Sequence, residues 1–141
     1  MTALRLLLFR SGGQVLAVDA GDVREIIAAG ESTRIPGAAR AIRGLVNVRG
    51  TLVPVVDMAE AVGLGGVNGS AGTLVIVERH TKPVALAVDE VLDLVTVQAA
   101  SLDDRASLPG VRADLVRAVG SAGGHSFVQL ATDALLEPLL P

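Results

Sequence analysis

Short apolar runs separated by Gly, Pro and Asp dominate this chain, and they constrain its fold more than any other feature. The runs are rich in Val, Ile and Leu, and their lengths are typical of β-strands rather than of helices. Many short strands at regular spacing indicate an all-β fold with a few short helices, of the barrel or sandwich kind. We predict ten strands, at 3–10, 14–18, 24–28, 45–49, 51–56, 73–79, 83–88, 91–97, 115–120 and 126–131.

Turn and capping residues divide these runs. The Ser-Gly-Gly segment 11–13 predicts a hairpin loop between the first two strands. Pro54 lies inside an apolar run, and because proline has no N–H we expect an edge strand or a bulge there. Asp57 can cap a short helix that ends near residue 62, and Thr132 or Asp133 can cap a last helix.

The Gly-rich segment 63–72 lies near the midpoint of the 141 residues, a length that suits one domain. We therefore expect a single domain over 1–141, built from two small five-stranded β-barrel subdomains that divide near 63–72. Neither half is expected to be stable without the other. Phe9 and Phe127 are the two aromatic residues in the sequence, so the core must be made of Val, Leu, Ile and Ala.

Composition argues against most kinds of chemistry. The sequence has no Cys, and His80 and His125 have no carboxylate or second His at metal-ligand spacing. The net charge is −3 and Lys and Arg form no run, which argues against nucleic-acid binding. We expect no enzyme activity, no catalytic residue, no cofactor and no metal.

No apolar stretch is long enough for a membrane helix, and the run at 6–9 is too short for a signal peptide. We therefore expect a cytoplasmic protein without direct membrane insertion.

The segment from Thr33 to Asp57, TRIPGAARAIRGLVNVRGTLVPVVD, is unusual because it gathers four Arg residues in an acidic chain. It resembles the signature of the CheW-like chemotaxis coupling proteins in order and spacing. The matching positions are Thr33, Arg34, Ile35, Pro36, Ile42, Gly44, Asn47, Arg49, Gly50, Val53, Pro54, Val55, Val56, Asp57 and Met58. The segments 21–27 and 73–97 also resemble the family.

The resemblance implies two five-stranded β-barrels that share an apolar seam, and a scaffold function in bacterial chemosensory signalling. Such a protein couples a methyl-accepting chemoreceptor to a CheA-type histidine kinase, and is recruited to receptor arrays in the cytoplasm. The helical hairpin tip of the receptor binds in a groove between the barrels, and the regulatory domain of the kinase binds another surface.

The resemblance also suggests site residues. Candidate receptor contacts are Val23, Glu25, Ile27, Arg49 and Leu74, and the candidate kinase contact is Gly44. Asn47, Arg49, Gly50, Pro54 and Asp57 are expected to hold the structure of the motif.

Three further points stay open at the level of sequence. Arg49 has two interpretations, a structural clamp on a carbonyl or an acidic partner, or a residue of the receptor groove. Val23, Ile26 and Ile27 are close together, and since a strand sends Ile26 and Ile27 to opposite faces, at least one should lie outside the core. Gln129 interrupts the last predicted strand where family members usually have an aliphatic residue.

Two alternatives to the coupling function remain. One is a CheW-like paralogue that binds a receptor but not the kinase. The other, more remote, is an enzyme or a small-ligand carrier.

Overall fold

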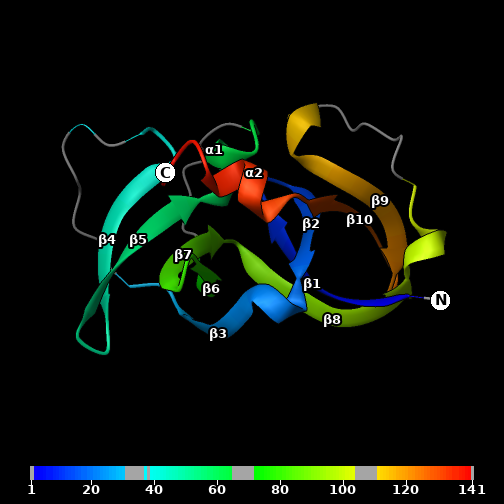
Figure 1. Cartoon of the computed structure of the whole chain (residues 1–141), viewed down its shortest axis with the longest axis horizontal. Helices are drawn as coiled ribbons and strands as arrows, with labels where there is room; N and C mark the ends of the chain where they lie inside the picture. Colours follow the sequence, from blue (N-terminus) through cyan, green and yellow to red (C-terminus); the bar gives the residue numbers. More distant parts are fainter. Residues whose placement is uncertain (1, 31–36, 38, 65–71, 104–110, 141) are drawn as a thin grey trace.

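The computed structural model describes residues 2–30, 37, 39–64, 72–103 and 111–140, and consists mainly of β-strands. The strands form two five-stranded sheets, with the orders β8-β1-β2-β10-β9 and β3-β6-β7-β5-β4. Figure 1 shows the sheets side by side, with the helix α2 lying over their junction. The predicted all-β class, with a few short helices, is confirmed.

The elements follow in chain order. The strands are β1 (Ala3–Ser11), β2 (Gln14–Asp19), β3 (Val23–Ala28), β4 (Ile42–Val48), β5 (Thr51–Asp57), β6 (Thr73–Arg79), β7 (Lys82–Val88), β8 (Glu90–Gln98), β9 (Val116–Ala122) and β10 (His125–Leu130). The helices are α1 (Met58–Ala61), α2 (Thr132–Leu136) and the 3-10 turns η1 (Ala20–Asp22), η2 (Ala99–Ser101) and η3 (Ala113–Leu115).

The sheets are not made from consecutive halves of the chain, so the predicted division near 63–72 is wrong. Strands β6 and β7, which follow that segment, join β3, β4 and β5, whereas β8 crosses over to pair with β1. The physical reason lies in β1, whose consecutive residues from Leu6 to Phe9 are all buried. The backbone N–H and C=O groups of a strand buried in this way need hydrogen-bond partners along both edges, and β8 supplies the second edge.

Alternation along β1 separates two apolar cores. Leu6 and Leu8 pack inside the first sheet, together with Phe127 of β10. Leu7 and Phe9 point the other way and join a cluster that draws residues from both sheets. This second cluster is the predicted apolar seam.

The second sheet repeats the arrangement. Ala85 and Ala87 of β7 pack inside it against Leu74 of β6, whereas Val75 and Leu86 face the seam. The small Ala side chains leave room for the branched residues of neighbouring strands inside a narrow, curved sheet.

Both sheets curl toward barrels, but neither forms a continuous ladder around its circumference. In the first sheet, one antiparallel bridge links Asp103 to Val119 of β9, with two backbone hydrogen bonds of 2.8 Å. In the second sheet, β3 and β4 are the two ends of the strand order. The barrels predicted from the sequence are therefore only half-closed.

Two local predictions need correction. Of the two alternatives for Pro54, the edge strand is wrong, because β5 lies between β4 and β7. The other alternative, a bulge, has a counterpart in the register shift of β4 against β5 opposite Val55 and Val56. Pairing of β5 with β7 begins only at Val55, so the missing N–H falls where that side is still unpaired. The last helix is capped by Ala131 without a side-chain hydrogen bond, rather than by Thr132 or Asp133.

Candidate functional site

Strand β3 carries most of the predicted receptor contacts and forms one edge of the second sheet. A register shift between Val23 and Glu25 reverses the side to which later residues point. Val23 lies opposite Val77 and Ile26 opposite Val75, and both partners belong to the seam. Because paired residues share a face of a sheet, Val23 and Ile26 point toward the seam.

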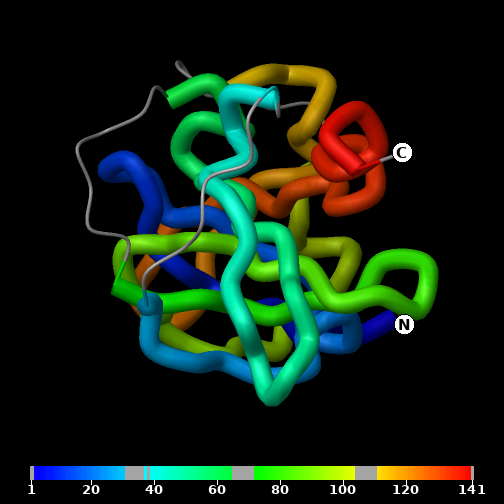
Figure 2. The backbone as a smooth tube through the Cα atoms, turned by 90° about the vertical axis from the view of Figure 1, so that its left-hand side faces the viewer, coloured from blue at the N-terminus to red at the C-terminus, as the bar shows by residue number. Residues whose placement is uncertain are grey.

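Ile26 is one of the large apolar side chains that the structure leaves in solvent, with 44% of its surface exposed. Leu94 of β8 is 49% exposed and lies opposite Leu7, which is also a seam residue. Strands β3 and β8 run along the same lower edge of the molecule in Figures 1 and 2. We name Val23, Ile26 and Leu94 together the seam surface.

Arg49 lies in a hairpin turn, whereas the sequence predicted it at the end of a strand. Arg49 and Gly50 have φ values of 51° and 85°, and two positive φ values are the signature of a type I′ turn. The side-chain oxygen of Asn47 accepts a hydrogen bond of 2.8 Å from the Gly50 N–H and braces the turn. The predicted structural roles of Asn47 and Gly50 therefore have a geometric basis.

The Arg49 side chain reaches across the open edge of the second sheet to β3. Its Nη1 lies 2.6 Å from Oε1 of Glu25, and Figure 2 shows the β4–β5 hairpin descending to the level of β3. The hydrogen bond from Arg49 lowers the pKa of Glu25, and the same contact raises the pKa of Arg49. The pair thus spans the gap between β3 and the hairpin, above a cavity of about 160 Å³.

Other predicted contacts lie away from the surface. Leu74 is 3% exposed and belongs to the core of the second sheet. Ile27 is half-buried against the same core, opposite Leu74. Gly44 is buried in β4, beside a register shift in its pairing with β5. None of the three offers a large exposed side chain to a partner.

Asp57 joins strand β5 to helix α1. Its carboxylate accepts a hydrogen bond of 3.2 Å from the Glu60 N–H, so Asp57 is the predicted N-cap. It also accepts two hydrogen bonds from Arg43, of 2.9 and 3.1 Å. The motif residues Thr33 to Pro36 lie outside the described part of the chain.

The prediction from sequence missed one apolar surface. Leu52 of β5 is 63% exposed and lines a groove of about 670 Å³ with Pro54, Val84, Leu139 and Leu140. We name these five residues the tail groove, and Arg79, His80 and Lys82 also line it. The alternation along β5 could have indicated this surface: Val53 and Val55 are buried, so Leu52 and Pro54 point to the opposite face of the sheet.

The described residues contain no group of three or more His, Cys, Asp or Glu side chains placed to hold a metal ion. None of the described helices has the length and apolar character needed to cross a membrane.

Comparison with known families identifies this arrangement. The family model of the CheW-like domain matches residues 5–138, which is nearly the whole chain. This chain belongs to the CheW-like domain family.

Individual relatives agree with the CheW-like assignment. The chain is 34% identical over 93 residues to a Rhizobium etli protein named "Probable chemotaxis protein CheW", and 26% identical over 98 residues to the chemotaxis protein CheW of Thermotoga maritima. These matches cover 65% and 70% of this chain, and 60% and 65% of the relatives. The matched region therefore spans less than two thirds of each relative's length.

A solved structure shares the CheW-like fold. The crystal structure of the scaffolding protein TtCheW from Thermoanaerobacter tengcongensis superposes with a TM-score of 0.83, at 21% sequence identity. The superposition covers 96% of this chain and 89% of that one.

Proposed function

We propose that this CheW-like chain is a cytoplasmic adaptor that couples a methyl-accepting chemoreceptor to a CheA-type histidine kinase through protein–protein contacts. The observation that carries the proposal is the presence of two separate apolar surfaces, the seam surface and the tail groove, on one scaffold of this family. An adaptor needs two such surfaces because it holds two partners at once.

We assign the receptor to the seam surface. A receptor tip is a helical hairpin, and an exposed apolar strip between two sheets suits the apolar face of a helix. Ile26 and Leu94 are the central contacts of the revised proposal, with Val23 beside them. Ile27 and Leu74 are no longer proposed as direct contacts, because they face the core.

The Glu25–Arg49 pair has a separate role in this proposal. Both side chains are at the surface, and exposed ion pairs contribute little to the stability of a fold. The pair instead fixes the hairpin relative to β3, and so sets the shape of the edge that meets the receptor. Of the two interpretations of Arg49, the exposure of the pair favours the functional one.

We assign the regulatory domain of the kinase to the tail groove. Leu52 is the most exposed large apolar residue in the described part of the chain, and it lies on the hairpin side of the second sheet rather than on the seam. Gly44 acts indirectly, because the register shift beside it sets the pairing of β4 with the strand that carries Leu52.

The experiment that tests the assignment is co-elution with separate partners. The chain is mixed either with a receptor tip fragment or with the kinase regulatory domain and passed over a sizing column. Ile26→Asp should abolish co-elution with the receptor fragment alone, and Leu52→Asp should abolish co-elution with the kinase domain alone. If each variant lost both partners, or neither, the assignment of the two surfaces would be wrong.

A further inference from the structure

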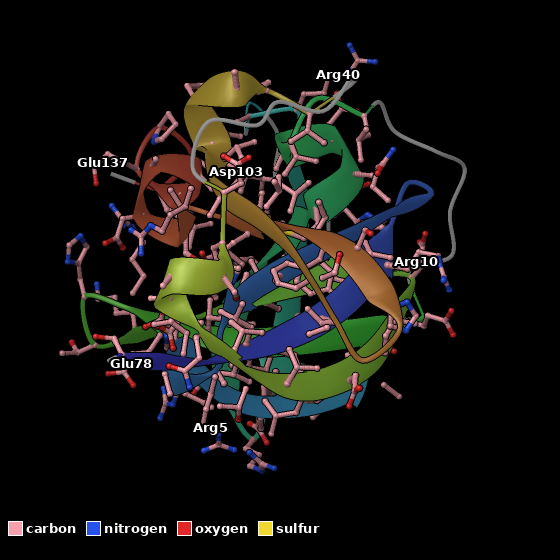
Figure 3. The ribbon with its side chains drawn as sticks, turned by 90° about the vertical axis from the view of Figure 1, so that its right-hand side faces the viewer. Arg5, Arg10, Arg40, Glu78, Asp103 and Glu137 are labelled. Atoms are coloured by element: carbon pink, nitrogen blue, oxygen red, sulfur yellow. The ribbon has the colours of Figure 1, made fainter. Side chains whose placement is uncertain are left out.

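A polar cavity lies at the junction of the two sheets, next to the tail groove, with which it shares Arg79. Its volume is about 240 Å³, and four carboxylates line it, those of Asp19, Asp22, Glu78 and Asp133. The carboxylates come from β2, η1, β6 and α2, so they are brought together only by the fold. In Figure 3, Glu78 lies on the same margin of the molecule as Glu137, which follows α2. We name this cavity the acidic pocket.

A buried amide also lines the acidic pocket. Gln129 of β10 is 4% exposed, and its side chain makes no hydrogen bond within the described part of the chain. Among the described residues, every fully buried side-chain oxygen or nitrogen has a hydrogen-bond partner, whereas the Gln129 amide has none. The amide must therefore reach the open space of the pocket. The amide thus presents hydrogen-bonding atoms that have no protein partner to whatever enters the pocket.

The cationic side chains nearby pair with only some of the carboxylates of the acidic pocket. Arg79 lines it, but its guanidinium is bound to Glu137 and to the Leu140 carbonyl at 3.2 Å, with Asp133 3.6 Å away. Arg117 also lines the pocket, and it makes no ion pair among the described residues. Glu78 lies 3.6 Å from the guanidinium of Arg24, which leaves Asp19 and Asp22 as the carboxylates of the pocket without an ion pair among the described residues.

The pKa of Asp22 reflects the excess of negative charge in the pocket. Its pKa is raised by partial burial, and further by repulsion from Asp19 and Asp133, against a smaller opposing effect of Arg117. Asp19 accepts one hydrogen bond of 2.8 Å from the Gly21 N–H, and a carboxylate has further lone pairs available. The pocket thus offers several unused acceptors and excess negative charge.

The spacing of these acceptors favours an organic cation over a metal ion. The described acidic residues are not grouped closely enough for three of them to ligate one ion. A guanidinium group is planar and has five N–H donors, so it can bind acceptors that are several ångströms apart. Its charge suits the carboxylates, and one of its N–H groups can donate to the amide oxygen of Gln129.

We propose that the acidic pocket binds a guanidinium group, held by the carboxylates of Asp19 and Asp22 and by the amide oxygen of Gln129. The guanidinium belongs either to a free arginine-like molecule or to an arginine side chain of a partner. The proposal goes beyond the coupling function, because Asp19, Asp22 and Gln129 belong neither to the seam surface nor to the tail groove.

The test is a titration of the ¹⁵N-labelled full chain with arginine, followed through the side-chain amide resonance of Gln129. Citrulline is the matched control ligand, because it replaces the guanidinium by a neutral ureido group of nearly the same shape. Arginine should shift the Gln129 resonance saturably, with a Kd of about 1–10 mM, and citrulline should not. Equal shifts with both ligands, or no shift with arginine, would overturn the proposal.

A matched pair of variants locates the site. Asp22 and Asp114 are both exposed carboxylates in 3-10 turns that precede a strand, but Asp114 does not line the pocket. Asp22→Asn should weaken arginine binding about tenfold, whereas Asp114→Asn should not change it. Gln129→Leu should weaken binding several-fold, as followed by calorimetry. Unchanged binding in both pocket variants would place the ligand elsewhere and contradict the proposal.

A blocked Gly-Arg-Gly peptide separates the two sources of the guanidinium. If the pocket receives a partner's side chain, the peptide should bind at least as tightly as free arginine. If it receives a free molecule, arginine should bind about tenfold more tightly than the peptide. Either result supports a guanidinium site, and failure of both ligands to bind refutes it.

Discussion

Truncation of the seam surface gives the most informative prediction about receptor binding. Ile26→Ala and Leu94→Ala remove most of an exposed apolar side chain, on β3 and β8 respectively. Leu52→Ala is the matched control, because it makes the same kind of change at 63% exposure in the tail groove. The three variants differ mainly in which partner they should affect.

The expected size of the effect follows from exposure. Complete burial of an Ile or Leu side chain is worth about 1.5–3 kcal/mol, so covering the 44% of Ile26 that is exposed contributes roughly 0.7–1.3 kcal/mol. That corresponds to roughly a three- to ninefold change in Kd. The 49% exposure of Leu94 leads to a similar change, and if the two contacts are independent their effects multiply in the double variant.

Calorimetric titration with a receptor tip fragment measures these changes, and melting curves show whether each variant is folded. Ile26→Ala also loses its half-buried packing, so its Tm should fall by roughly 3–6 °C without loss of the folded state. Receptor affinity that is unchanged in the folded Ile26/Leu94 double variant, or reduced equally by Leu52→Ala, would refute the assignment of the seam surface.

Three further predictions concern the framework. Arg49→Ala should lower Tm at pH 7 by no more than a few degrees but reduce receptor coupling. The pKa of Glu25 is lowered in the folded chain, so the stability that Glu25 contributes is present above its unfolded pKa and is lost as the pH falls through its folded pKa. The Tm of the variant should therefore depend less on pH in the acidic range than that of the unaltered chain. A large loss of Tm at neutral pH would show a structural clamp instead. Leu86→Ala leaves a cavity in the seam and should destabilise the chain by about 2–5 kcal/mol in denaturant unfolding, and a loss below about 1 kcal/mol would mean that the seam is loosely packed. Asp57→Ala removes the cap of α1 and the partner of Arg43, and should lower the free energy of unfolding by about 1–2 kcal/mol. Asp57→Asn should lose less stability, because Asn can still cap the helix. Equal losses in both variants would exclude the capping role.

Much of the fold was predictable because alternation is a local property. The apolar runs gave ten strands close to their observed positions, and the capping of α1 by Asp57 followed from one side chain and its spacing. The order of the strands was not predictable in the same way. Nothing in the sequence of β8 indicates that it pairs with β1 rather than with its neighbour β7, because that choice depends on burial of the whole assembly.

The site was predicted less well, for a reason visible in β3. A single register shift near Arg24 reverses which residues face the seam, so Ile26 is exposed and Ile27 is half-buried. Sequence spacing alone could show that Ile26 and Ile27 diverge, but not which of them faces outward. Arg49 was misplaced because an Arg with positive φ is uncommon, and the expected residue in such a turn is Asn or Asp.

Simultaneous binding of receptor and kinase is the central claim, and one measurement tests it directly. Light scattering on a sizing column determines the mass of a mixture of this chain, a receptor tip fragment and the kinase regulatory domain. The coupling proposal predicts a ternary complex with one copy of each, because the seam surface and the tail groove are separate. A binary complex with the receptor alone, with the kinase domain eluting free, would contradict it and identify the chain as a receptor-binding paralogue.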